Sequence, residues 1–445
     1  MSSGMERSIE NRLTELFQAH EELLGVDQAS PLTRFRRAAM EQVTHLGIPK
    51  KGSGNGDRYH YTSLRETFDQ PWHYLFTASE QETASSAVHS TEALPGEMYR
   101  TTFVNGFCAD EQKLVQLPNG VVYGSLAAAV ESFPELVARY YNTLTADTND
   151  AVEALTAAFV QDGAFVYVPK GVRVELPIAV ESRFGGADQA IATFGRNLFI
   201  FEEGSEARLV LDYRSVDQTA VLACRTREMF VGAGARIDMV EGCRLNNGSS
   251  LVSCSRVSQS KASVLHAVSV ALSGKLMRNE QRVRLEGQGA ENHTNGLMIA
   301  GKDEHLDFTT DIEHLVSDCN SYQLFKGVAA DGGTSVFSGR IYVAQDAQRT
   351  QAFQQNNNLL LGDEAHVYAK PQLEIYADNV KCSHGATVGQ LDPEAIYYMR
   401  QRGIDLEDAR RLQMYGFVLD VLAESRVPQM NELFDREIGA KIEAL

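Results

Sequence analysis

A strand, a tight turn and a second strand recur along the middle of the chain, between residues 163 and 389. The turn residues recur 30 to 33 positions apart, at Gly171, Gly204 and Gly234 and again at Gly332 and Glu364. One such coil cannot bury its apolar side chains alone, whereas stacked coils can. The spacing therefore predicts a parallel β-helix. The alternative is a β-sandwich, which usually turns about every 8–12 residues.

The segments on either side of the repeat show helical patterns and turn signals. An open β-helix end exposes its core, so we expect the C-terminal helices to cap it, with partner docking as the alternative. Apolar residues near the turns are expected inside: Val168, Val174, Phe201, Leu209, Val231 and Ile237. The expected regions are a helical region with a linker (1–97), a mixed hairpin and helix entry segment (98–162), the β-helix core (163–390) and a C-terminal helical domain (391–445).

The charge of the chain limits its partners. Its 445 residues carry a formal net charge of −18, from 41 Lys and Arg against 59 Asp and Glu. Nucleic-acid binding needs a basic surface, so we expect no such partner. The apolar runs are too short to span a membrane, and residues 1–10 lack the apolar core of a signal peptide. We therefore expect a cytoplasmic protein with no membrane partner.

The six cysteines are scattered, and none forms a Cys-x-x-Cys pair. A disulfide framework and a self-contained zinc or iron–sulfur site are therefore not expected. Cys382 and His384 lie two positions apart, which places them on one face of an extended strand. They could supply a thiol and an imidazole to a metal, or act as a nucleophile and its base. The simpler alternative is a buried cysteine beside a turn.

The sequence lacks the motifs of common enzyme classes. It has no phosphate-binding Gly-x-x-x-x-Gly-Lys-Ser/Thr loop, no Gly-x-Ser-x-Gly elbow and no His-Glu-x-x-His pair. Asp307, Asp311 and Glu313 alternate along one expected strand and could form the acidic pair of a β-helix polysaccharide lyase or hydrolase. Acidic residues are common on solvated strands, so this alternative is the weaker one.

One long motif resembles a known family. Residues 370–389, which read KPQLEIYADNVKCSHGATVG, are similar to the C-terminal signature of the SufB/SufD family of iron–sulfur cluster assembly proteins. Residues 356–361 (NNNLLL) and 397–404 (YYMRQRGI) extend the resemblance on both sides, and residues 47–52 (GIPKKG) and 162–172 (DGAFVYVPKGV) extend it toward the N-terminus. It therefore covers most of the chain.

Two differences from SufB-type chains favour the SufD type. SufB-type chains have Cys-Glu-His-Glu-Ala-Thr where this sequence has Cys-Ser-His-Gly-Ala-Thr, starting at Cys382. They also often carry cysteines near the N-terminus, whereas the first cysteine here is Cys108. The resemblance implies a right-handed parallel β-helix with helical N- and C-terminal domains, which agrees with the repeat.

The resemblance also implies a function. It implies a non-catalytic subunit of the SUF system that pairs with SufB through the end of the β-helix and docks SufC, an ABC-type ATPase, through the C-terminal helices. A transient iron–sulfur cluster would form at the SufB interface, with no cofactor tightly bound to the isolated chain. His384 is implied at that interface, as a tentative metal ligand shared with SufB, and Cys382 is the weaker candidate. We expect SufC contacts from Arg400, Arg402 and Ile404.

Two further alternatives stay open. One is a SufB-like scaffold that holds the nascent cluster itself. The other concerns assembly, since the isolated chain could form a homodimer in the absence of SufB.

Overall fold

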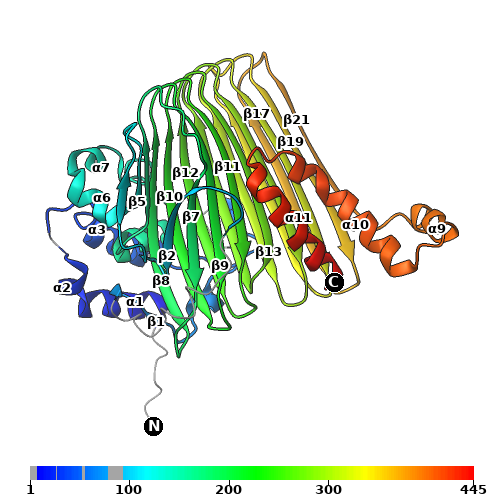
Figure 1. Cartoon of the computed structure of the whole chain (residues 1–445), viewed down its shortest axis with the longest axis horizontal. Helices are drawn as coiled ribbons and strands as arrows, with labels where there is room; N and C mark the ends of the chain where they lie inside the picture. Colours follow the sequence, from blue (N-terminus) through cyan, green and yellow to red (C-terminus); the bar gives the residue numbers. More distant parts are fainter. Residues whose placement is uncertain (1–7, 27, 53–55, 79–93) are drawn as a thin grey trace, which may run out of the picture.

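The computed structural model describes residues 8–26, 28–52, 56–78 and 94–445. Most of the linker expected before residue 98 therefore lies outside the described residues. The described chain forms a parallel β-helix of about eight turns with helices at its N- and C-terminal ends (Figure 1). The prediction of a mainly β fold with a parallel β-helix core is confirmed.

Successive strands of the β-helix alternate between two sheets, so each strand pairs in parallel with the second strand after it. One sheet consists of β1 (His73–Tyr74), β4 (Leu114–Gln116), β5 (Val122–Ser125), β6 (Ala164–Val168), β8 (Ile191–Phe201), β10 (Val221–Val231), β12 (Ser250–Gln259), β14 (Leu276–Leu285), β16 (His305–His314), β18 (Thr334–Val343) and β20 (His366–Ile375). The other consists of β2 (Tyr99–Val104), β3 (Phe107–Cys108), β7 (Ile178–Phe184), β9 (Glu206–Ser215), β11 (Arg236–Arg244), β13 (Val264–Ser273), β15 (Glu291–Ala300), β17 (Asn320–Ala330), β19 (Gln351–Leu361) and β21 (Lys381–Gly389). We call them the eleven-stranded and the ten-stranded sheet.

The interior between the two sheets is the main hydrophobic core. Alternate side chains of each strand point inward and stack on the equivalent residues of the next coil. These side chains form one continuous cluster of buried residues that runs through the stacked coils. The prediction of interior residues is confirmed, since all six are at least 96% buried: Val168, Val174, Phe201, Leu209, Val231 and Ile237.

Two antiparallel hairpins extend the sheets at the N-terminal end of the β-helix. β2 and β3 are joined by Asn105 and Gly106, whose φ angles are 47° and 97°. β4 and β5 pair around the second Asn-Gly turn, where Gly120 has a φ of 85°. Positive φ at these positions is what a tight hairpin requires and what Asn-Gly favours.

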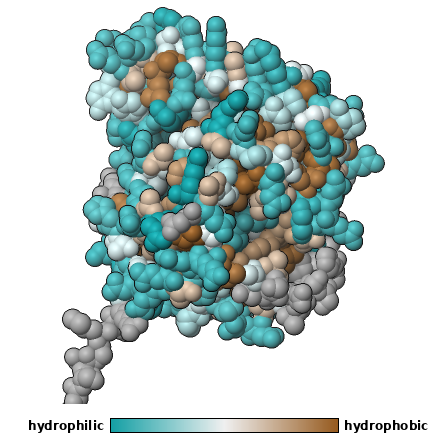
Figure 2. All heavy atoms as spheres, turned by 90° about the vertical axis from the view of Figure 1, so that its left-hand side faces the viewer, coloured by the Kyte–Doolittle hydropathy of each residue, from teal (hydrophilic) through white to brown (hydrophobic). Residues whose placement is uncertain are grey.

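The N-terminal helices pack on the outer face of the eleven-stranded sheet. Every residue of α8 is buried, because this helix lies between α3 and strands β8, β10 and β12. Figure 2 shows that hydrophilic side chains cover much of the end of the molecule on this side, with several hydrophobic patches between them. The elements of this region are α1 (Ile9–Ala19), α2 (Glu21–Leu24), α3 (Arg36–Leu46), η1 (Gly56–Tyr59), α4 (Arg65–Phe68), α6 (Leu126–Ser132), α7 (Pro134–Tyr140) and α8 (Ala151–Phe159).

The C-terminal helices are α9 (Pro393–Gln401), α10 (Leu406–Ala423) and α11 (Pro428–Glu443). α10 and α11 lie across the outer face of the ten-stranded sheet, over β13, β15 and β17 (Figure 1). Their apolar residues, such as Val418 and Phe434, share a cluster with outward-facing Val240 and Val270 of the sheet. The expectation that these helices cap the open end is therefore wrong. The apolar outer face of the sheet offers an amphipathic helix a larger surface to bury than the end does.

Within the described ranges, none of the helices is long and apolar enough to cross a membrane.

We predict that Phe434→Ala strongly destabilises the protein. The Phe434 ring is fully buried, and a Cβ placed on Gly242 would lie 2.9 Å from it, so glycine makes room for the ring. Truncation should lower the free energy of unfolding by about 3–5 kcal/mol, measured by urea denaturation. Leu412→Ala, on the exposed face of α10, is the matched control and should cost less than about 0.5 kcal/mol. Equal losses would contradict the docked position of α11.

Candidate functional site at the open end of the β-helix

The C-terminal end of the β-helix is open. β20 and β21 are the last strands of their sheets, and each pairs with one neighbouring strand among the described residues. Eight of the nine residues of β21 are exposed, whereas strands in the middle of the β-helix are mostly buried. An edge strand carries backbone donors and acceptors that can pair with another chain. This end can therefore receive a further strand or a partner sheet.

Cys382 and His384 lie on this last strand. In the register of β19 and β21, Cys382 is opposite Ala352 and His384 is opposite Gln354. Cys382 is half-buried and packs against the interior cluster that contains Ala352. Because side chains alternate along a strand, His384 lies on the same side of β21 as Cys382. His384 is nevertheless exposed, since no further coil covers it.

The interior becomes polar next to His384. Gln354 is 3% exposed, and neither polar atom of its side chain has a hydrogen-bond partner among the described residues. Its neighbour one coil earlier, Gln323, accepts a hydrogen bond of 2.7 Å from the Thr310 hydroxyl. A buried amide without partners costs about 1–3 kcal/mol, so such groups are usually retained for a reason. Here they place hydrogen-bonding groups directly behind the exposed imidazole.

Cys382 is the most accessible thiol of the protein. The other five cysteines are buried, and all six are free. Burial raises the pKa of Cys108 to about 11 and that of Cys224 to about 12. Partial burial also raises the pKa of Cys382, although a hydrogen bond from the backbone of Ala352 opposes the shift. Cys382 is therefore the cysteine best placed to meet a partner or a metal.

Apolar side chains are exposed around the open end. Tyr376, just after β20, is 61% exposed, and Val388 on β21 is 52% exposed. Ile375, the last residue of β20, is also exposed. Exposed apolar residues that gather at one place, next to unpaired strand edges, are typical of an interaction surface.

Arg400, Arg402 and Ile404 lie on a different element from His384. They belong to the end of α9 and the turn after it, and α9 has no buried residue. Arg400 and Arg402 are exposed, whereas Ile404 is half-buried. The Arg402 guanidinium lies 5.1 Å from the Tyr398 ring centre and donates a hydrogen bond of 2.9 Å to its hydroxyl. Figure 1 shows α9 at the tip of the C-terminal region, away from the body of the β-helix.

The sequence analysis included Tyr397 and Tyr398 in the motif YYMRQRGI but assigned them no role at this surface. Tyr397 and Tyr398 are 66% and 59% exposed, which is unusual for neighbouring tyrosines on a helix.

The acidic residues considered for carbohydrate cleavage are all paired with arginines. Asp307 is buried and bonded to Arg278, and Asp311 accepts a hydrogen bond of 2.9 Å from Arg340. Glu313 lies 3.6 Å from the same Arg340 guanidinium. An acid and a nucleophile for glycoside cleavage must face an open substrate groove. These carboxylates instead balance the charge of the arginines beside them on the eleven-stranded sheet. The structure therefore does not support a polysaccharide lyase or hydrolase.

A surface hollow of about 660 Å³ leads from β21 along the outer face of the ten-stranded sheet. His384, Ser383 and Phe353 line its part near the open end, and Tyr322 and His293 line the part toward the middle of the sheet. Glu424, at the end of α10, also lines it. The rings of His293, Tyr322 and Phe353 stack in order, with centroids 4.8 and 5.6 Å apart. These residues are about 30 positions apart in sequence, so only the register of the coils brings them together.

Comparison with known proteins identifies the class of this fold and site. The SufBD core domain of the SUF system for iron–sulfur cluster assembly matches residues 184–417, and the N-terminal region of SufBD proteins matches residues 7–180. The chain therefore belongs to the SufBD family and has a role in iron–sulfur cluster assembly. The predicted membership of the SufB/SufD family is confirmed.

Individual relatives show which members of the family the chain is similar to. The iron–sulfur cluster assembly protein SufD of Escherichia coli is 32% identical over 301 residues, which is 66% of this chain and 71% of that protein. SufD of Bacillus subtilis is 27% identical over 399 residues, 88% and 90% of the two chains. The chloroplastic protein ABCI7 of Arabidopsis thaliana is 27% identical over 423 residues, 92% and 86% of the two chains. The predicted similarity to SufD is thus confirmed.

We predict that a thiol reagent modifies Cys382 first under native conditions. The pKa of Cys382 is raised, so little thiolate exists at neutral pH. The labelling rate should therefore rise about tenfold per pH unit from pH 7, and this rise should continue beyond the ordinary cysteine pKa of about 8.5. Iodoacetamide labelling followed by mass spectrometry measures this rate at each peptide. Cys382→Ser should remove the fast-labelling site, and faster labelling of any other cysteine would contradict the prediction.

Proposed function

We propose that this chain is a SufD-type subunit that pairs with SufB through the open end of its β-helix and docks SufC through its C-terminal helices. The iron–sulfur cluster would form at the SufB interface as the product of the complex. The observation that carries this proposal is the exposed last strand β21, on which the family signature places His384.

The two ends of the β-helix support this choice of interface. At the N-terminal end the sheets finish in hairpins that turn back on themselves. At the C-terminal end β20 and β21 are partly or fully exposed, and α10 and α11 pack on a face without covering that end. A partner of the same architecture could continue both sheets across this end. Such an interface would also bury Tyr376 and Val388, which water now surrounds.

His384 is proposed as the group that this chain contributes to cluster formation. Neutral imidazole is a borderline ligand that suits iron. His384 is exposed on an edge strand, where a thiolate of a partner could approach the same iron. Cys382 has a secondary role in this proposal, because it is half-buried and its raised pKa disfavours the thiolate that binds metal.

The SufC surface is proposed on α9 and the turn that follows it. Arginine and tyrosine are enriched among residues that dominate protein interfaces, and Arg400, Arg402, Tyr397 and Tyr398 are all exposed here. α10 anchors this surface to the body, because its buried face includes Val418 and Val421 in the cluster with the ten-stranded sheet. Deletion of the whole C-terminal region would expose that cluster, so point substitutions are the better test.

The proposal assigns no catalytic residue to this chain. The energy for remodelling the complex would come from SufC, and sulfur would enter on the SufB side. The iron–sulfur cluster would be transient in the complex and would not stay tightly bound to the isolated chain.

We predict that His384→Ala slows cluster formation by the complete SufB–SufC–SufD complex about tenfold or more, because removal of a ligand weakens metal binding by at least that order. The measurement is anaerobic reconstitution with iron and sulfide, followed by the visible absorption of the cluster. Complex yield from size-exclusion chromatography should be unchanged.

His366→Ala is the matched control, since His366 is an exposed histidine on the neighbouring strand β20. It should form clusters at the wild-type rate, and Cys382→Ser should show a smaller loss than His384→Ala. A wild-type rate in His384→Ala would refute the ligand role. A chromophoric cluster on the isolated wild-type chain would instead favour the SufB-like scaffold.

We predict that the double substitution Arg400→Glu and Arg402→Glu weakens SufC binding at least tenfold, because it reverses two exposed charges at the proposed contact. A pull-down with purified SufC followed by titration calorimetry measures the loss. Arg173→Glu is the control, since the Arg173 side chain is 82% exposed in the first coils, on another element. Equal SufC affinity for the wild type and the double variant would remove α9 from the interface.

A further inference from the structure

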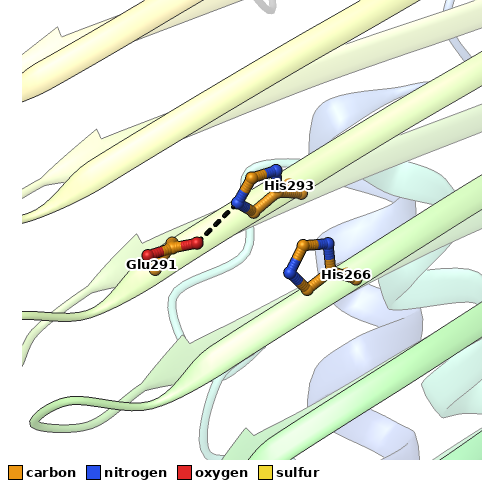
Figure 3. Close-up of side chains that lie close together, drawn as sticks. All are labelled: His266, Glu291 and His293. Atoms are coloured by element: carbon orange, nitrogen blue, oxygen red, sulfur yellow. Dashed lines mark hydrogen bonds and ion pairs between the residues drawn. The ribbon is translucent and has the colours of Figure 1, made fainter. Parts of the chain in front are cut away.

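Three side chains with metal-binding groups meet on the outer face of the ten-stranded sheet, apart from the open end. His266 on β13 and His293 on β15 are in-register partners, and Glu291 lies two residues before His293 on the same strand face. Their candidate ligand atoms all lie within 4.8 Å of one another. Figure 3 shows the two imidazole rings side by side, with the Glu291 carboxylate directed at His293.

The contacts within this cluster leave one nitrogen available on the buried histidine. Glu291 is 2.7 Å from His293 Nε2, and the rings of His293 and His266 stack with centroids 4.0 Å apart. His266 is 4% exposed, and its Nδ1 atom has no hydrogen-bond partner among the described residues. A buried ring nitrogen without a partner is costly unless something binds to it.

Charge and access are both compatible with a cation at this place. Two arginines, Arg426 and Arg236, act electrostatically on the His266 ring. These arginines oppose a bound cation, whereas Glu291 attracts it. Asp238, the in-register neighbour of His266 on β11, adds a second carboxylate close by.

Two surface hollows give access to the cluster. His293 lines the hollow that leads to β21, and His266 lines a second hollow of about 420 Å³ on the other side. Both lie along the ends of α10 and α11, since Glu424 lines the first and Arg426 the second. The partly exposed His293 is therefore open to one hollow, and the buried His266 borders the other.

We propose that His266, Glu291 and His293 form a binding site for one divalent transition metal ion. Two imidazoles and a carboxylate are the ligand set that suits Zn²⁺ and Fe²⁺, with water completing the coordination. Donor atoms around one such ion lie roughly 3.4 Å apart, so the most widely spaced of the three ligand atoms, which lie within 4.8 Å of one another, must approach, whereas Glu291 and His293 Nε2, at 2.7 Å, must move apart. Rotation of the two rings about the bond to Cγ achieves this, because that torsion is soft in histidine.

This site is distinct from the proposed cluster interface. His384 and Cys382 belong to β21, whereas the metal ligands belong to β13 and β15. β17 and β19 separate the two sets of residues, since each strand of the sheet pairs with its neighbour in the order β21, β19, β17, β15 and β13. The hollow that contains His293 also reaches His384, so an ion held here would be stored close to the interface.

The test uses the full-length chain, purified without a polyhistidine tag, and Co²⁺ as a spectroscopic probe under anaerobic conditions. We expect one equivalent of Co²⁺ with visible d–d bands and no sulfur-to-cobalt charge-transfer band, because no thiol belongs to the site. Zn²⁺ and Fe²⁺ should displace the probe. A charge-transfer band, or no binding by the wild-type chain, would overturn the proposal without the need for any variant.

Variants then assign the ligands. Glu291→Gln keeps the side-chain volume, and His293→Ala removes a partly exposed ring, so both should fold with a wild-type circular dichroism spectrum. Each should weaken Co²⁺ binding at least tenfold. His384→Ala should bind Co²⁺ as the wild type does, which separates this site from the cluster interface. Unchanged Co²⁺ affinity in both Glu291→Gln and His293→Ala would overturn the assignment, whatever the outcome of the cluster-formation assay.

Discussion

Each coil of this β-helix relies on the coils before and after it to satisfy its backbone hydrogen bonds. From β6 to β21, each strand pairs in parallel and in register with the second strand after it. This pairing stacks like residues into columns and buries a continuous interior. It also has an unavoidable consequence, since the last coil has no successor. The exposed edge of β21, where Cys382 and His384 lie, is the direct result of that constraint.

The helices are attached to the outer faces of this stack through apolar contacts and paired charges. On the eleven-stranded sheet, the Arg58 guanidinium lies 2.9 Å from Glu280 and 3.5 Å from Asp150. Glu280 and Asp150 are buried, and Arg58 is one of several groups that compensate them, since Glu280 also pairs with Arg278 and Arg282. On the ten-stranded sheet, Arg244 pairs with Glu437 of α11. Helices held on the faces leave the C-terminal end free for partners.

The sequence predicted those features of the site that depend on adjacent residues, and it did not predict those that depend on residues far apart in the chain. The period-two alternation placed Cys382 and His384 on one strand face, because it depends on a few adjacent residues. The position of the C-terminal helices could not be predicted in this way. It depends on which outer face is apolar, and Val240 and Val270 form such a face only after the strands are in register.

The sequence by itself determined the β-helix, its interior residues and the resemblance of its signature to the SufB/SufD family. A 30-residue repeat of apolar residues and turns permits few other ways of burying those residues. The tertiary structure alone decided which distant residues meet. His266 and His293 are neighbours because one coil brings β13 beside β15 in register, and the length of that coil depends on its turns. Such a contact comes from the sum of many local geometries, and no short segment of the sequence contains it.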